Sequence, residues 1–191
     1  MSKQNIYNIL LRGLGNVYAV CGIMGNLQAE SALHSNNLQN SGNRVLDMTD
    51  DEYTIAVDNG DYTNFVRDSH GYGLAQWTFW SRKDMLLDYA HQHNVSISDE
   101  TMQCNFILHE LETNYKGLLR ELKCCTSVQE ASDKFCTMYE RPADQSRNAL
   151  DKRAKYGNEL YTELCSIDLT EANFLIELDA LLNKYGYKRG A

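Results

Sequence analysis

The chain has 191 residues, 43% of them hydrophobic, which suffices for one full-sized domain with its own core and, less comfortably, for two. Its formal net charge of −8 argues against a nucleic-acid partner, because affinity for a phosphate backbone rests on clustered Lys and Arg. No apolar run reaches the roughly 18 residues that a membrane-spanning helix needs, so we expect no stable membrane insertion.

Helical periodicity covers the first part of the chain. A helix is predicted over residues 3–12, and a glycine-rich step leads from it into a second helix that ends at Ser31. One face of this second helix carries, at helical spacing, Val17, Val20, Met24, Leu27 and Glu30. The polar residues 31–44 that follow predict a long surface loop.

The middle of the chain carries the signals for β structure. Thr49 and Glu52 have the spacing of a capping box, which predicts a short helix running to about Val57. After a turn, residues 62–66 have the β-branched and aromatic content of a short strand. We therefore expect a small β-hairpin between residues 60 and 75.

The rest of the chain predicts helices, over residues 80–93, 98–123, 127–140, 145–165 and 170–185. The predicted fold class is α+β, mainly α-helical, with the one small β-hairpin. We expect a main domain over residues 1–166 and a C-terminal helical extension over residues 167–191.

Glu30 is the most informative single residue. It continues an apolar stripe and lies at the C-terminal end of its helix, where partial desolvation and the helix dipole both favour the neutral form of a carboxyl group. A carboxyl group that keeps its proton near neutrality is what glycosidic cleavage requires, because the leaving oxygen must be protonated. Position alone leaves the alternative open that Glu30 is an ordinary, partly buried glutamate with a hydrogen-bond partner.

Two further motifs follow Glu30-Ser31 in order. The first is Gly-Tyr-Gly-Leu-Ala-Gln-Trp-Thr at residues 71–78, and the second is Phe-Cys-Thr-Met-Tyr-Glu-Arg-Pro at residues 135–142. The ordered set resembles the phage tail-type lysozymes, within the superfamily of goose-type lysozymes and soluble lytic transglycosylases. Ala75 stands where many members of that superfamily have Met. The resemblance covers residues 5–165.

The resemblance implies a lysozyme-like fold over residues 1–166, with the hairpin beside a glycan cleft. Glu30 would be the general acid, and Tyr139 would lie behind it and help to orient it. Substrate-binding roles would fall to Ser31, Tyr72, Gly73, Gln76 and Trp77. Gln76 would offer a donor and an acceptor to the sugar. Trp77 would either stack on a sugar or pack in the core, and for Trp80 core packing is the favoured interpretation.

Glycosidases usually pair the acid with a second carboxylate. Asp68 precedes the glycine-rich motif by a few residues, and we expect it to activate a water molecule. Glu140 follows Tyr139 directly, and an ion pair with Arg141 or another nearby base is the expected explanation for it.

The predicted function is cleavage of the β-1,4 MurNAc–GlcNAc bond of peptidoglycan by hydrolysis. Two alternatives stay open: a lytic transglycosylase that leaves 1,6-anhydroMurNAc ends, and a non-catalytic wall-binding or phage structural protein. A cysteine peptidase or amidase of the wall is disfavoured, because Cys21 lies inside a helix and no histidine stands in a matching context.

The six cysteines lack metal-ligand spacing, so we expect no metal and no cofactor. The N-terminus lacks the features of a signal peptide, which predicts synthesis in a cytoplasm. The chain would then reach the wall by holin-dependent release or within a phage particle, with tail components as partners.

Overall fold

The computed structural model describes the backbone of residues 3–184 and the side chains of residues 3–165. Over this part of the chain the structure is helical and contains no strand. The helices in chain order are α1 (Lys3–Leu14), α2 (Val17–Ser31), α3 (Asn40–Leu46), α4 (Asp50–Asp58), α5 (Trp80–His93), α6 (Glu100–Thr113), α7 (Lys116–Lys123), α8 (Val128–Phe135), the π-helical turn η1 (Cys136–Glu140) and α9 (Arg147–Lys184).

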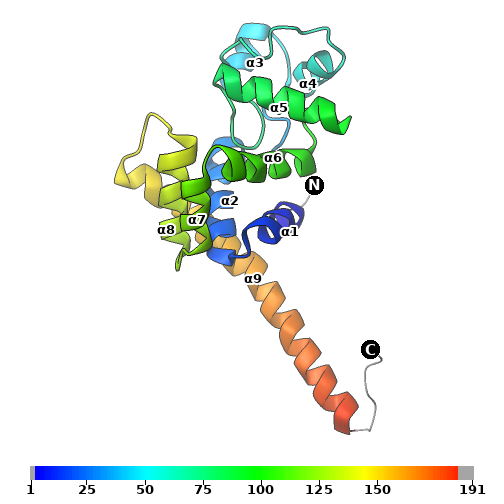
Figure 1. Cartoon of the computed structure of the whole chain (residues 1–191), viewed down its shortest axis with the longest axis vertical. Helices are drawn as coiled ribbons and strands as arrows, with labels where there is room; N and C mark the ends of the chain where they lie inside the picture. Colours follow the sequence, from blue (N-terminus) through cyan, green and yellow to red (C-terminus); the bar gives the residue numbers. More distant parts are fainter. Residues whose placement is uncertain (1–2, 185–191) are drawn as a thin grey trace.

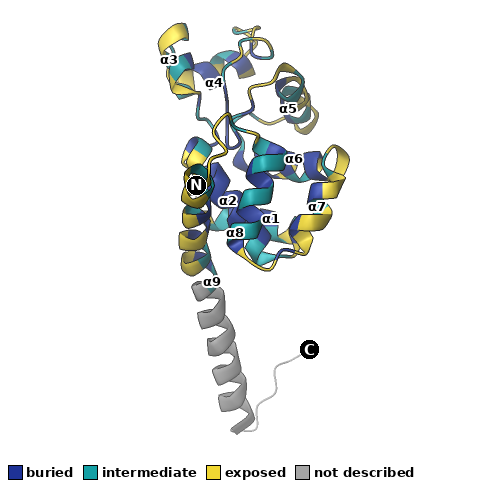
Figure 2. Cartoon of the chain, turned by 90° about the vertical axis from the view of Figure 1, so that its left-hand side faces the viewer, coloured by how far each residue is buried: buried dark blue, intermediate teal, exposed yellow. Residues whose placement is uncertain are grey.

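Helix α2 is the centre of the fold. It packs most extensively against α9 and α8, and also against α1 (Figures 1 and 2). Its residues 19–27 are all buried, as the apolar composition of this segment requires. The Asn16 side chain caps its N-terminus by accepting hydrogen bonds from the backbone N–H groups of Tyr18 and Ala19. The helix ends at Ala32, which adopts a left-handed conformation.

Two glycines allow α2 and α9 to approach closely. A Cβ atom at Gly25 would lie 2.4 Å from the carbonyl oxygen of Arg153, and one at Gly157 would lie 2.7 Å from the carbonyl oxygen of Cys21. Neither position has room for a larger residue unless the backbones move apart. This contact brings the Arg153 side chain of α9 beside the C-terminal end of α2.

Several predicted helices are confirmed. Helix α5 has the predicted bounds, and α4 begins with the predicted capping box, in which the side chains of Thr49 and Glu52 each accept from the other's backbone N–H. Other boundaries were wrong. Helix α3 lies partly within the predicted loop over 31–44, and the predicted helix over 98–123 is divided at Asn114 into α6 and α7.

The predicted helices over 145–165 and 170–185 form one continuous helix, α9, although Tyr185 lies outside the described residues. The proposed boundary between residues 166 and 167 therefore falls inside a helix. The division into a main domain and an extension stays a prediction.

The predicted β-hairpin between residues 60 and 75 was wrong. This segment forms turns, and the β-type pairing near it consists of two isolated bridges, both made by Tyr72. The aromatic residues that suggested a strand, Tyr62 and Phe65, instead pack against Tyr53 of α4, in a cluster that also includes Tyr72. Burial of these rings against α4 favours turns over an extended pair, which explains the error.

Candidate active site

A cleft of about 930 Å³ opens at the C-terminal end of α2. One side is formed by residues 28–32 of α2 and by the segment from His34 to Arg44. The rest of the lining comes from Ala75, Gln76, Thr78 and Phe79, from Arg82 of α5 and from residues 140–142 at the end of η1. The cleft therefore collects residues that are far apart in the sequence, and two of them, Glu30 and Glu140, are carboxylic acids.

Glu30 lies in this cleft and forms an ion pair with Arg153. The Arg153 Nη2 atom donates to Oε1 of Glu30 at 2.5 Å, and the two side chains are 12% and 21% exposed. The second guanidinium nitrogen of Arg153 donates to Asn26 Oδ1 at 3.3 Å, which fixes the guanidinium against α2. The charge of Glu30 is therefore matched by one neighbour, and part of the carboxyl group still faces the cleft.

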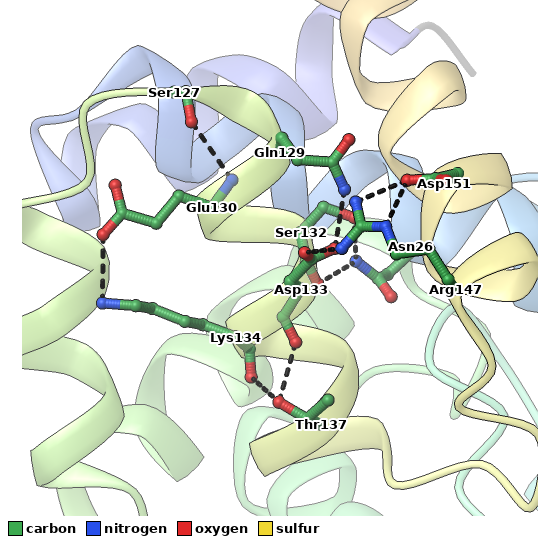
Figure 3. Close-up of polar contacts among 10 residues, drawn as sticks. All are labelled: Asn26, Ser127, Gln129, Glu130, Ser132, Asp133, Lys134, Thr137, Arg147 and Asp151. Carbon is green, nitrogen blue, oxygen red and sulfur yellow. Dashed lines mark hydrogen bonds and ion pairs between the residues drawn. The ribbon is translucent and has the colours of Figure 1, made fainter.

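Polar contacts hold α8 against α2 and α9 (Figure 3). The buried Asn26 amide donates to both the backbone carbonyl and the hydroxyl group of Ser132, each at 3.1 Å. At the start of α9, Arg147 pairs with Asp133 at 2.8 Å and also with Asp151. These contacts fix the direction in which the chain leaves α8 and enters η1.

Glu140 is the last residue of η1, and π-helical turns are frequent at functional sites. Its Oε1 atom is buried and has no hydrogen-bond partner among the described residues. The expected ion pair with Arg141 was wrong: Arg141 has a left-handed conformation with φ of 53°, and its Nε atom donates to the carbonyl of Met138. Burial and the nearby Glu30 carboxylate raise the pKa of Glu140 well above its usual range, whereas Arg82 and Arg153 oppose this shift.

A buried carboxylate behind the cleft, Glu110 of α6, joins three elements. It accepts from Trp77 Nε1 at 3.0 Å, from the Tyr139 hydroxyl at 2.5 Å and from two nitrogens of Arg82 at 2.8 Å. The Arg82 guanidinium also lies 4.4 Å from the centre of the Tyr139 ring. Burial, followed by the Glu110 charge, raises the pKa of Tyr139 well above its ordinary value.

Tyr139 therefore has a different partner from the one expected. It is 1% exposed, stacks on Phe135 and bonds to Glu110, and no hydrogen bond joins it to Glu30. Its effect on the cleft runs through Arg82, which lines the cleft, and through its neighbour Glu140.

The glycine-rich motif forms a tight turn that closes one side of the cleft. Ser31 donates to the Leu74 carbonyl at 2.9 Å, which fixes the turn to the end of α2. Gln76, at φ of 46°, lines the cleft, and its amide nitrogen donates to the backbone and the side chain of Asn37. Gly73, at φ of 76°, lies against the amide of Gln103. Of the predicted substrate-binding residues, Ser31 and Gln76 line the cleft.

The three others lie behind the surface of the cleft. Tyr72 and Trp77 are fully buried, and their polar atoms bond to Thr54 and Glu110. Gly73 is likewise buried and is not among the residues that line the cleft. The ring of Trp77 packs edge-on against Phe106, which corresponds to the core alternative. These three residues therefore lie in supporting positions, and a direct role in sugar binding stays a prediction.

Asp68 also lies outside the cleft, contrary to the expected role in water activation. Its side chain is 2% exposed and pairs at 2.5 Å with Lys83, whose side chain is fully buried. Asp68 also accepts from the hydroxyl groups of Tyr53 at 2.5 Å and Tyr62 at 3.3 Å. Burial lowers the pKa of Lys83, and Asp68 opposes that shift. Both Asp68 oxygens are thus occupied by protein donors, and neither is left for a water molecule or a sugar.

Two large aromatic residues are exposed at the edge of the cleft. Phe79 is 63% exposed and belongs to the cleft lining, and its ring centre lies 6.0 Å from that of Trp80. Trp80 is 49% exposed, with the Arg67 guanidinium 5.7 Å from its ring centre, so the expected core position was wrong. Exposed aromatic faces are suited to stacking on sugar rings.

Sequence reasoning missed three residues of this arrangement: Arg82, Glu110 and Arg153. Arg153 lies 123 residues from Glu30, and no spacing rule connects them. Glu110 was placed correctly on a helix but carried no sign of its buried position. A buried Trp or Tyr usually has a polar partner. This rule alone could have predicted a hydrogen-bond acceptor near Trp77.

Within the part of the chain that the structure describes, no group of His, Cys, Asp and Glu residues is arranged to hold a metal ion. None of the described helices is long and apolar enough to cross a membrane.

The cleft is polar, and the carboxylic acid Glu30 lies in it at the end of the central helix α2. These features are those of a candidate glycan-binding enzyme domain. The family description of the phage tail lysozymes matches residues 2–164, and the chain therefore belongs to this family. The chain is also similar to Morphogenesis protein 1 of Bacillus phage B103, with 26% identity over 185 residues. That match covers 93% of the chain and 44% of the relative, so the chain spans less than half the length of this relative.

Proposed function

We propose that this chain is a peptidoglycan-cleaving glycosidase that hydrolyses the β-1,4 MurNAc–GlcNAc bond, with Glu30 as the proton donor. The observation that carries the proposal is the position of Glu30 at the end of the central helix, in a cleft of about 930 Å³, with its side chain partly exposed to that cleft. Membership of the phage tail lysozyme family supports the substrate class. The lysozyme-like fold belongs to the same proposal.

Substrate contacts are assigned to groups that face the cleft. Ala75, Gln76 and Thr78 line the cleft, and the exposed Phe79 ring offers an apolar face. Arg44 and Arg141 line the same cleft, and Arg44 is exposed on α3. Guanidinium groups match carboxylates in a bidentate manner, so these two residues are suited to the acidic groups of the peptide stems.

The printed name of the phage B103 relative supports a role within a phage particle. We assign the chain to the wall-cleaving part of such a particle, with peptidoglycan as substrate and tail components as neighbours. Release through a holin-dependent route is the alternative means of reaching the wall. Hydrolysis and lytic transglycosylation differ in whether water or the sugar's own 6-hydroxyl group attacks. Mass spectrometry of the digest distinguishes them, because only the second reaction leaves 1,6-anhydroMurNAc ends.

The decisive experiment compares wild type with Glu30→Gln on purified peptidoglycan. The substitution keeps the shape and removes the transferable proton, so lysis should fall by at least about 100-fold, the usual scale of general acid catalysis. Glu159→Gln is the matched control, because Glu159 is an exposed glutamate on α9, outside the cleft, and its loss should leave the rate unchanged. Lysis by Glu30→Gln at the wild-type rate would overturn the proposed function.

A further inference from the structure

Glu140 differs from Glu30, the other carboxylic acid of the cleft, because it forms no ion pair with a described residue. Two arginines lie near it, and each is already paired: Arg82 with Glu110 and Arg153 with Glu30. Three carboxyl groups thus share two guanidinium groups, and the unmatched one is also the one with a buried, unpartnered oxygen. A buried carboxylate without a partner is costly, and it avoids that cost by binding a proton.

The groups that face Glu140 come from four elements. They are Glu30 of α2, Arg82 of α5, Glu110 of α6 and Arg153 of α9. Burial and the carboxylates of Glu30 and Glu110 favour the neutral form of Glu140. The two arginines favour the ionised form, although each of them already forms an ion pair with another carboxylate. The balance raises the pKa of Glu140 well above its usual range. In the empty cleft, Glu140 therefore carries a proton.

We propose that Glu140 holds this proton in the free enzyme and passes it to Glu30 when a glycan strand enters the cleft. This inference rests on the proposed function. It gives Glu30, which forms an ion pair with Arg153, a nearby source for the proton that the glycosidic oxygen requires. Glu140 does not contact the substrate in this scheme and acts only by supplying a proton to Glu30. It is therefore a positioning residue and not a catalytic residue.

The steps balance in atoms and charge. An O–H bond of Glu140 breaks and one forms on Glu30, so the pair keeps a single negative charge. Glu30 then protonates the glycosidic oxygen, which leaves with the electron pair of its bond to C1, and the pair becomes doubly negative beside a positively charged sugar. A water oxygen bonds to C1, and the proton it releases returns to the pair. The net reaction consumes one water molecule and produces two sugar hydroxyl groups.

The trigger is desolvation of Glu30. In the empty cleft Glu30 is 21% exposed, whereas one Glu140 oxygen is already buried. A sugar ring over Glu30 excludes water from it and makes its environment resemble that of Glu140. The advantage of Glu140 as the site of the proton then diminishes, and the proton becomes available to the residue that contacts the substrate.

The test is the pH profile of the Glu140→Gln variant, measured as the initial rate at limiting purified peptidoglycan. A glutamine cannot store the proton, so Glu30 must take it from solvent. The alkaline limb should move to lower pH by at least about one unit, which lowers the rate at pH 8 by about 10-fold or more. Near pH 5, where solvent protons are plentiful, the rate should stay within about two-fold of wild type.

A purely structural role predicts a different result. A uniform loss at every pH, or an unchanged profile, would overturn the proposal. Glu159→Gln again serves as the control and should reproduce the wild-type profile. Glu30→Gln distinguishes failure of this inference from failure of the proposed function. If Glu30→Gln is inactive at all pH values while Glu140→Gln has an unshifted profile, the proposed function stands and this inference fails.

A second measurement does not depend on the variant being folded. The side-chain carboxyl carbons of ¹³C-labelled glutamates, assigned in the full wild-type chain through the backbone, report the protonation of each residue directly. At pH 7 the Glu140 resonance should have the chemical shift of a neutral carboxyl group. An ionised Glu140 at pH 7 would overturn the proposal.

Discussion

The carboxylates near the turn at residues 71–77 fall into two groups, one buried and one in the cleft. In the buried group, Asp68 and Glu110 have every oxygen occupied by donors from lysine, arginine, tyrosine or tryptophan. In the cleft group, Glu30 has a single arginine and Glu140 has an oxygen without a partner. Saturated carboxylates fix elements to one another, whereas undersatisfied ones keep the capacity to exchange protons.

The two buried carboxylates also fix the turn at residues 71–77 to the surrounding helices. Glu110 and Asp68 lie behind it, and each draws its partners from more than one element: Trp77, Arg82 and Tyr139 for the first, and Tyr53 and Lys83 for the second. A wall held in this way presents Gln76 and Phe79 to the cleft in fixed positions. Preorganised groups of this kind require little rearrangement during a reaction.

The largest expected effect is on the buried side, at Lys83. Lys83→Met leaves the Asp68 carboxylate buried without its countercharge, and breaking a buried pair in this way costs about 3–5 kcal/mol of stability. Chemical denaturation measures the loss. The double variant with Asp68→Asn should recover part of it, because both charges are then absent. A loss below about 1 kcal/mol would show that the two groups are less completely buried than the structure has them.

The next effect is at Glu110. Glu110→Gln removes the negative charge that faces Arg82 and weakens the bonds from Trp77 and Tyr139, for an expected loss of about 3 kcal/mol of stability. The thermal unfolding temperature reports it. Lysis per folded molecule should fall much less than in Glu30→Gln. Equal losses of lysis in the two variants would break the distinction between a supporting and a reacting carboxylate.

On the cleft side, Gly25→Ala tests the approach of α9 to α2. The added Cβ would lie 2.4 Å from the Arg153 carbonyl, so the helices must separate. Overpacking of this kind costs about 1–3 kcal/mol. The displacement also moves Arg153 away from Glu30 and should reduce lysis per folded molecule. Gly117→Ala is the control, since nothing lies within 4 Å of a Cβ atom at that position.

The smallest effect concerns the stability of Glu140→Gln as a function of pH. Since the pKa of Glu140 is raised in the folded state, its proton stabilises the folded protein below the pKa of the unfolded chain, and that contribution is lost as pH rises through the folded value. Glutamine has no such loss. The variant should therefore gain stability relative to wild type as pH rises, by about 1 kcal/mol or more at alkaline pH. A constant difference across the pH range would contradict the raised pKa.

Periodicity, capping and turn chemistry predicted most of the helices, including α4 and α5, because these signals depend on neighbours within a few residues. The sequence also singled out Glu30, through its place on an apolar face at a helix end and through the ordered motifs around it. The family followed from the same motifs and from residues 2–164 as a whole.

Tertiary structure decided what the other acids and aromatics do. The composition of residues 62–66 predicted a strand, yet these residues form turns, because their aromatic rings pack in the cluster around Tyr53. The position of Asp68 before the glycine-rich motif predicted a reactive carboxylate. In the structure its side chain is buried and forms an ion pair with Lys83 of α5. Glu140 was expected to pair with Arg141 or another nearby base, but Arg82 and Arg153 pair with Glu110 and Glu30 instead. Local sequence determines which segments are helical and where a carboxyl group can lie. Whether that carboxyl group keeps its proton depends on countercharges supplied by distant residues, and only the packed chain brings them together.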